Sequence, residues 1–328
     1  MRATRLSRRA TIGTLVLLAA TAARGRSADY PDRPIKMIVG FAAGGGTDVV
    51  ARIMAQKMSD ILHQTIVVEK RTGASGMIAA QDVAKSDPDG YTLMMGSQTT
   101  LAVAPHLYRK VHLNPEKDFA GVALTGASPL VLVVNPSFPA HSVADVIAMA
   151  KAGPGKINFG TGGLGTTPHM TAELFEHEAG IKLVHVAYRG EAGAINDLLA
   201  GQIPLMFANL SAVMGNIKGG TLRALAVTSA KRSPSAPDIP TDAESALPGF
   251  AAETWFGIVA PAGTPNEIRA KLNAAAREAL ARDDTRARFA DLGMTNGSSS
   301  PDELDAYIKS EIAKWSQVIA DANIQALD

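Results

Sequence analysis

Hydrophobic and polar residues follow one another along the chain in a recurring order of apolar strand, glycine-containing loop and amphipathic helix. The first unit starts with an apolar run at 35–39, passes through Gly44, Gly45 and Gly46, and leaves as a helix over 49–62. The apolar residues of that helix recur every three or four positions, at Val50, Ile53, Met54, Met58 and Ile61. The pattern therefore predicts a strand, a glycine loop and a helix in that order.

The same order recurs along the rest of the chain. Further strands are predicted at 64–69, 91–95, 130–135, 156–159, 182–187, 203–207, 222–228 and 255–260. Helices are predicted at 77–85, 143–151, 169–179, 194–200, 266–282 and 301–323, with a short one opening at Asn209 and Ser211. Strands that alternate with helices build a parallel sheet, and ligands bind beyond the carboxyl ends of such strands. The predicted fold class is therefore α/β.

The pattern restarts near residue 130, which divides the chain into two α/β units. The last helices have no strand after them, so they need an existing sheet to cover, and we expect them to return to the first unit. The strands near 130 and 256 then become the two crossings of a hinge. The prediction is two doubly wound α/β domains with a ligand cleft between them: domain 1 at 29–129 plus 252–328, and domain 2 at 130–251.

Composition supports an ordinary globular protein, because 46% of the 328 residues are hydrophobic and 19% are charged. Residues 1–28 are different. Four arginines begin this segment, an apolar run covers 12–23, and Ala20-Thr21-Ala22 matches a cleavage site. The segment is predicted to be a secretory signal peptide, because its apolar run is shorter than the ~20 residues that span a bilayer. Export would use the Sec route or, from Ser7-Arg8-Arg9, the twin-arginine route, to the periplasm.

Charge and cysteine content narrow the possible partners. Residues 1–28 hold six arginines and no acid, so their removal turns the formal charge of +1 into −5. A protein of that sign has no general attraction for nucleic acid, and we expect none as a partner. The chain has no cysteine, which excludes disulfides and a lipid-modified cysteine anchor. If it binds an anion, local donors must do so.

The loop at 40–48 is a candidate for such an anion site. Glycines allow the backbone to approach a ligand closely, and the first N–H groups of a helix carry the positive end of its dipole. Thr47 or Asp48 could cap the helix and leave the remaining amides for a ligand. The alternative is a purely structural turn between strand and helix.

Signals for catalysis, cofactors and metals are weak. Gly160-x-Gly162-x-x-Gly165 formally matches the dinucleotide fingerprint, but the next strand ends in Tyr188-Arg189 instead of an acid. His169 and Glu173 could share a metal, but no third ligand is evident, so His169 is better interpreted as a pocket-wall or capping residue. We expect no cofactor, no metal and no catalytic residue, which favours binding over catalysis.

Several short motifs together resemble a known family. They are Tyr30-Pro31-x-Arg33-Pro34-Ile35, 41–48 with Ala51-Arg52, 68–76, 87–92, Pro105-x-Leu107-Tyr108, 160–169, Val186-x-Tyr188-Arg189-Gly190 and 222–228. Across essentially the whole mature chain, these residues resemble the periplasmic substrate-binding proteins of tripartite tricarboxylate transporters, the Bug family noted for its expansion in Bordetella. The resemblance implies a periplasmic binding protein-like fold of class II type. It also implies a monomer that closes on a small organic acid and delivers it to a membrane permease.

The resemblance also implies which residues would hold the ligand. A carboxylate would be gripped between the loop at 41–48 and the facing Gly165-Thr166-Thr167, with bridging waters. The site residues expected on this basis are Phe41, Ala42, Gly45, Gly46, Asp48, Ser97, Gly165, Thr166, Thr167, His169, Tyr188 and Asn209.

The chain departs from the family pattern at one position. Proteins of this family commonly show Phe-Asp-Asn where this chain has Phe207-Ala208-Asn209. The acid that could receive a ligand amine or hydroxyl is missing there, so a plain carboxylate is expected instead of an amino acid. Two alternatives stay open: an exported hydrolase acting on a small carboxylate, and a ligand carrier for a signalling partner.

Overall fold

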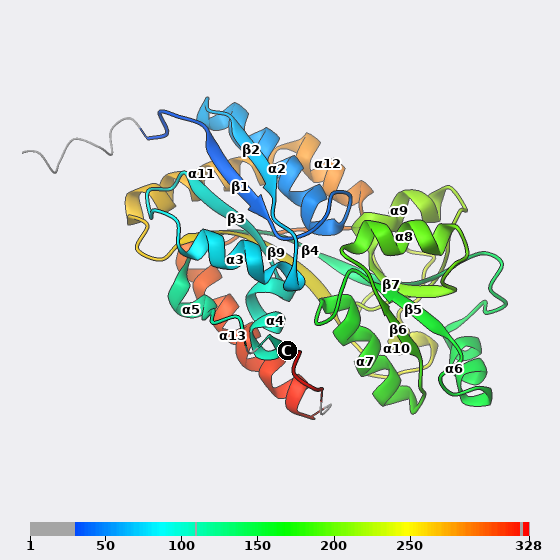
Figure 1. The fold of residues 1–328 in the computed structure, drawn as a ribbon. Coiled ribbons are helices and arrows are strands. Elements are labelled where there is room, and N and C mark those ends of the chain that lie inside the picture. The colour runs from blue at the N-terminus through cyan, green and yellow to red at the C-terminus, as the bar shows by residue number, and fades with distance from the viewer. Residues whose placement is uncertain (1–29, 109, 322–323, 328) are drawn as a thin grey trace, which may run out of the picture.

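The computed structural model describes residues 30–108, 110–321 and 324–327 (Figure 1). The predicted signal peptide at 1–28 lies outside the described residues and stays a prediction. Within the described part of the chain, no helix combines the length and the apolar character needed to cross a bilayer.

One continuous path of paired strands runs through both halves of the molecule, in the order β2-β1-β3-β9-β4-β7-β5-β6, with β8 and β10 paired to β4. The strands are β1 (Ile35–Val39), β2 (Ile66–Lys70), β3 (Thr92–Ser97), β4 (Phe119–Val134), β5 (Asn158–Thr161), β6 (Val184–Ala187), β7 (Leu205–Asn209), β8 (Arg223–Val227), β9 (Glu253–Pro261) and β10 (Thr295–Asn296). We call the part built on β1, β2, β3 and β9 the first lobe, and the part built on β5, β6, β7 and β8 the second lobe. They stand side by side in Figure 1.

Helices cover both faces of each half of the sheet. The first lobe carries α2 (Gly46–Leu62), α3 (Met77–Ala84), α4 (Ala104–Leu107), α5 (Pro115–Asp118), α11 (Asn266–Ala281), α12 (Asp283–Asp291) and α13 (Pro301–Asp321), with the short helices η1 (Ala74–Gly76) and η2 (Thr99–Val103). The second lobe carries α6 (Val143–Ala152), α7 (Thr167–Ala179), α8 (Glu191–Leu199), α9 (Leu210–Lys218) and α10 (Asp242–Ser245). The helices at the end of the chain return to the first lobe, in agreement with the sequence-based expectation.

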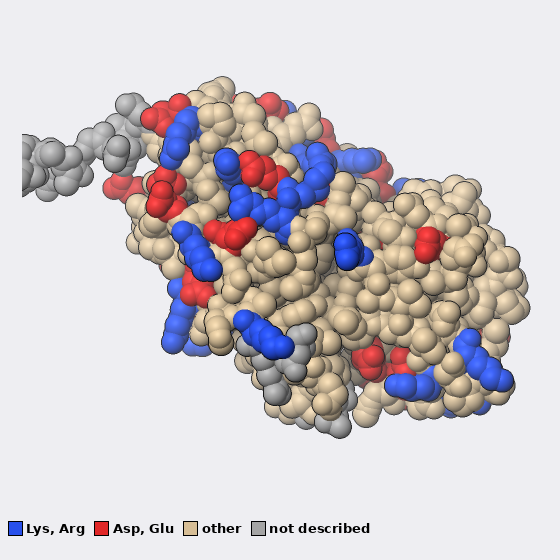
Figure 2. Space-filling view, viewed as in Figure 1, with Lys and Arg blue, Asp and Glu red and all other residues tan. Residues whose placement is uncertain are grey.

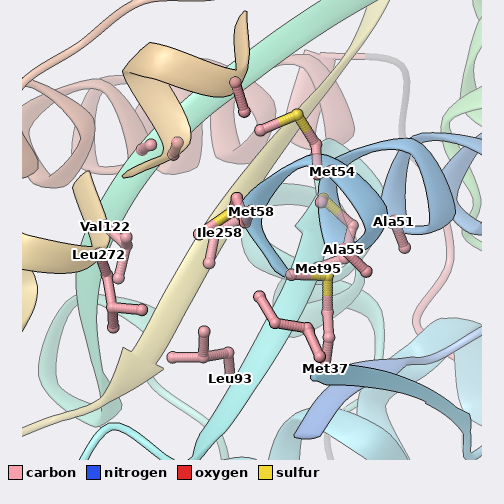
Figure 3. Packing of buried hydrophobic residues seen from close by; sticks show 14 of the residues in the cluster. Met37, Ala51, Met54, Ala55, Met58, Leu93, Met95, Val122, Ile258 and Leu272 are labelled. Atoms are coloured by element: carbon pink, nitrogen blue, oxygen red, sulfur yellow. The ribbon is translucent and has the colours of Figure 1, made fainter. Parts of the chain in front are cut away.

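Alternate residues of the central strands pack on opposite faces, which makes the sheet doubly wound. In β1, Met37 and Val39 belong to a core with α2 and α11, whereas Ile38 belongs to a second core with α3 and α13. Figure 3 shows the first of these cores, in which Met54 and Met58 of α2 pack near Ile258 of β9. Strands buried on both faces read as continuous apolar runs, which is why the sequence pattern at 35–39 shows no alternation.

β4 belongs to both lobes. Its first part, from Phe119 to Pro129, pairs antiparallel with β9, and its last part, from Leu130 to Val134, pairs with β7 and β8. The sequence pattern predicted only the last part, as a strand at 130–135. The pattern did not indicate the first part of β4 because this part contains Gly126 and Pro129, and both residue types weaken a strand pattern. One strand therefore links the lobes without an intervening loop.

On the face of the molecule seen in Figure 2, acidic and basic side chains are mixed over the first lobe. Most of the visible surface around the junction of the lobes is uncharged.

Candidate functional site

The glycine loop after β1 places the start of α2 at the junction of the lobes. The helix begins at Gly46, earlier than the predicted residue 49, and its N-cap residue Gly45 has no side-chain cap. Asp48 instead accepts hydrogen bonds from the backbone N of Gly44 at 3.0 Å and from Nε of Arg52 at 2.9 Å. The expectation that Thr47 or Asp48 caps the helix is therefore wrong, because the Asp48 carboxylate is used to hold the loop in place.

A second glycine loop, after β5, places the start of α7 opposite. Thr166 is the N-cap residue of α7, and its Oγ1 accepts a hydrogen bond from the backbone N of His169 at 3.4 Å. The Nδ1 atom of His169 accepts from the backbone N of Gly165 at 3.1 Å. His169 also stacks on His185, with ring centroids 4.1 Å apart. His169 thus supports this loop from behind.

The two loops border a small space between the lobes, with a cavity volume of about 30 Å³, which we call the inner cavity. Both lobes contribute to it. It is lined by Phe41, Gly45, Gly46, Thr47, Ser97, Thr99, Gly162, Thr166, Pro168, Glu191, Asn209 and Thr254. Among the predicted site residues, the structure places Phe41, Gly45, Gly46, Ser97, Thr166 and Asn209 in this lining.

A larger space of about 420 Å³, the outer cavity, adjoins the inner one and shares Phe41 and Gly162 with it. Tyr188 and Arg189 line the outer cavity. The hydroxyl of Tyr188 donates a hydrogen bond to Asp197 at 2.7 Å, and burial together with this contact raises the pKa of Tyr188 to about 12. Tyr188 therefore stays protonated and is held by its own lobe.

The remaining predicted site residues, Ala42, Asp48, Gly165, Thr167 and His169, line neither cavity. They lie around it. A Cβ at Gly190 would come within 2.7 Å of the Ala42 side chain, so the backbones of the two lobes nearly touch there. Thr167 contacts Thr99 across the junction. The structure thus places these residues in the support of the cavity, and their direct contact with a ligand stays a prediction.

Each lobe receives a side-chain oxygen from the other at the start of a helix. The backbone N of Gly46, in α2, donates to Oε2 of Glu191 at 3.1 Å. The backbone N of Thr167, in α7, donates to Oγ1 of Thr99 at 2.8 Å, and the two threonine Oγ1 atoms lie 2.9 Å apart. The lobes are therefore in contact through both of the helix ends between which the resemblance places the ligand.

Glu191 is the central residue that the sequence-based prediction missed. Its Oε1 accepts hydrogen bonds from the backbone N and Nδ2 of Asn209 at 2.6 and 3.0 Å, and its Oε2 accepts from the backbone N of Gly46 and again from that Nδ2, at 3.1 and 3.0 Å. Burial raises the pKa of Glu191 above its ordinary value, and the hydrogen bonds from Asn209 and Gly46 oppose the rise. All these neighbours are N–H donors, so the site fits the ionised carboxylate, which only accepts.

Glu191 adds an acid to the cavity that the inference from Ala208 did not consider. That inference concerned only the acid missing at position 208, and the preference for a plain carboxylate over an amino acid stays a prediction. Ala208 is fully buried in the hydrophobic core of the second lobe. The only available signal was an acid in the first turn of the helix after Gly190, and acids are common in that position because of the helix dipole.

Three buried polar atoms in the lining have no hydrogen-bond partner among the described residues: Oγ of Ser97, Oγ1 of Thr254 and Oδ1 of Asn209. Ser97 and Thr254 are each only 2% exposed. Buried polar groups are nearly always satisfied, so unpaired atoms gathered in one cavity indicate a place for a polar ligand or water. Thr254 was not predicted, because it follows a predicted loop and carries no motif.

His169 and Glu173, the pair considered for a metal, lie close together in the structure. Nε2 of His169 lies 3.4 Å from Oε1 of Glu173, and this contact lowers the pKa of Glu173. Burial, with His169 beside it, lowers the pKa of His185 to about 3. Among the described residues, no group of three or more potential ligands could hold a metal ion.

Comparisons with known proteins agree with one another. The family model for the tripartite tricarboxylate transporter family receptor, TctC, matches residues 50–324. Protein BugT of Bordetella pertussis is 39% identical over 311 residues, which are 94% of this chain and 95% of that protein.

Two solved structures are similar in sequence and fold. R. palustris Rpa4515 with adipate superposes with a TM-score of 0.89 at 37% identity, covering 91% of this chain and all of that one. MatC (Rpa3494) from Rhodopseudomonas palustris with bound malate gives a TM-score of 0.84 at 33% identity, covering 88% of this chain and all of the other.

Proposed function

Because the chain belongs to the family of tripartite tricarboxylate transporter receptors, we propose that it captures a small organic carboxylate between its lobes and delivers it to a membrane permease. The family model and the similar solved structure confirm the family and the two-lobed α/β fold that the sequence predicts. The chain is therefore a periplasmic solute-binding protein. We further propose that it acts as a monomer whose domains divide at the predicted bounds, near 130 and 252.

One observation carries the proposal: the inner cavity lies between the lobes and contains unpaired polar atoms from both. Ser97 and Thr254 supply hydroxyl groups from the first lobe, and Asn209 supplies a carbonyl oxygen from the second. A ligand that bridges these atoms gains contacts only when the lobes are together, which is how a two-lobed receptor couples binding to closure. The adipate and malate in the two similar structures make small carboxylates the first class to test.

The test is a thermal-shift screen of the purified mature protein against mono-, di- and tricarboxylates, including adipate and malate. A specific ligand at 100 times its Kd stabilises the folded state by about 2.7 kcal/mol and raises the melting temperature. Chromatography of the ligand after prolonged incubation should return it unchanged. A screen without any stabilising carboxylate would reject the proposal, and the appearance of product would favour the hydrolase.

A variant that fills the cavity sharpens the screen. In Gly46→Ala, the new Cβ would lie 3.2 Å from Cγ of Asn209 and 3.2 Å from Cζ of Phe256, so Asn209 must move. We expect roughly tenfold weaker binding, since overpacking of this kind costs about 1–3 kcal/mol. Gly215→Ala is the matched control, because a Cβ there meets no atom within 4 Å, and its affinity should equal that of the parent protein.

A further inference from the structure

The inner cavity already contains a negative charge that belongs to the protein. Each carboxylate oxygen of Glu191 takes part in two hydrogen bonds, with donors from Gly46 and Asn209. A carboxylate offers about four acceptor positions, so Glu191 has none left for a hydroxyl or amine of the ligand. The carboxylate of Glu191 therefore occupies the positive end of α2 itself. Its negative charge acts on a ligand in the cavity, but it has no free acceptor position to offer that ligand.

No positive side chain balances that charge inside the cavity. The inner cavity's lining contains no lysine, arginine or histidine among the described residues, whereas the outer cavity is lined by Arg189. Hydroxyl groups of Ser97 and Thr254 can stabilise one ligand carboxylate as donors. A second ionised carboxylate in the same small cavity would face Glu191 with no counter-charge.

We propose that Glu191 restricts the inner cavity to ligands that carry no more than one ionised carboxylate, so that the transported solute is a monoanion. This inference rests on the proposed function and narrows its substrate class. It separates this chain from the similar structures that hold adipate and malate, both of which are dicarboxylates.

The test compares ligands that differ in charge and hardly in shape. Succinate, glutarate and adipate are each titrated by calorimetry against the corresponding monoamide, in which a neutral amide replaces one carboxylate. For the unmodified protein, the monoamide of a pair should bind roughly 10- to 100-fold more tightly than the diacid, because one unit charge near another costs this much at the effective dielectric of a protein site.

Two variants identify the residue responsible. Glu191→Gln removes the charge, and it should bring the affinities for diacid and monoamide to within about threefold of each other. Glu178→Gln removes the same charge from an exposed position on α7, outside both cavities, and it should keep the full preference of the unmodified protein. The comparison of ligands on the unmodified protein stands even if Glu191→Gln does not fold.

The outcomes separate this inference from the proposed function. A diacid that binds the unmodified protein as tightly as its monoamide would overturn the restriction while leaving carboxylate capture intact. An unchanged preference in a folded Glu191→Gln protein would equally overturn the role of Glu191. If none of the acids or amides binds, and the wider carboxylate screen is also negative, the proposed function fails and the restriction fails with it.

Discussion

Asp242 is a buried acid outside the ligand site that has no compensating partner. It is fully buried at the start of α10, and neither carboxylate oxygen has a hydrogen-bond partner among the described residues. Burial raises the pKa of Asp242 to about 7. The folded protein therefore keeps this proton at pH values where the unfolded chain has lost it, so Asp242 makes the fold less stable as pH rises from about 4 towards 7.

We predict that Asp242→Asn removes a specific part of the pH dependence of stability. Between about pH 5 and pH 8, the free energy of unfolding of the parent protein should fall by about 2–3 kcal/mol more than that of the variant. Urea unfolding of the ligand-free protein at several pH values measures this difference. Asp238→Asn, at an exposed position in the same segment, is the control and should follow the parent protein. Parallel pH profiles for Asp242→Asn and the parent would contradict the prediction.

For single residues, the sequence predicted membership of the cavity lining where that position depends only on the residue's own segment of the chain. Gly45 and Gly46 follow a strand and open a helix, so sequence alone could place them at the turn that lines the inner cavity. Glu191 and Thr254 join the cavity only because one lobe meets the other, and no pattern within their own segments records that meeting. Tyr188 lines the outer cavity, where Asp197 holds its hydroxyl group, and its contact with a ligand stays a prediction.

At the scale of elements, the strands and helices of the βα units were predicted to within a few residues. Their apolar runs are long and are bounded by glycine and proline, which are strong signals. The prediction failed for η2, a π-helix at 99–103, and for α12, at 283–291. The segment of α12 is strongly polar, and its helix is fixed mainly by the burial of Thr285 and Phe289. Such a short element depends on tertiary packing more than on pattern.

β4 also depends on tertiary packing, and Gly126 in this strand gives a testable prediction. Gly126 allows β10 to approach, because a Cβ there would lie 2.5 Å from the carbonyl oxygen of Thr295 and 3.3 Å from Phe289. Gly126→Ala should therefore separate β10 from β4 and lower the free energy of unfolding by about 2–3 kcal/mol. Chemical denaturation measures the loss. Gly215→Ala, in α9, should instead be neutral or stabilise by up to about 1 kcal/mol, and equal losses in both variants would contradict this account.

At the scale of the whole molecule, the lobes meet through hydrogen bonds at two helix ends and through the hydroxyl groups of Ser75 and Tyr108, which donate to the carbonyl oxygen of Leu164. The contact of Thr99 with Thr167 is the simplest to remove, since valine has nearly the shape of threonine. We predict that Thr99→Val makes the ligand-free protein more open and weakens ligand binding about 5- to 10-fold, as expected for the loss of one or two hydrogen bonds. Small-angle scattering and calorimetry measure the two effects.

A second threonine provides the control for that experiment. Thr171, in α7, is also fully buried, but its Oγ1 has no hydrogen-bond partner among the described residues. Thr171→Val makes the same chemical change without removing a contact between the lobes, so compactness and affinity should be those of the parent protein. If Thr99→Val also matches the parent in both measurements, the threonine pair does not hold the lobes together.

Because β4 passes directly from one lobe to the other, the protein should resist proteolysis at this crossing outside the cytoplasm. At Pro129 and Leu130 the strand exchanges its neighbour β9 for β7 and β8, and its backbone is paired on both sides of that point. Proteases cut exposed loop tips, where the backbone can enter their active sites. At this crossing the backbone of β4 is paired and forms no exposed loop, so the proteases of the periplasm should not cut the chain there and separate the two lobes.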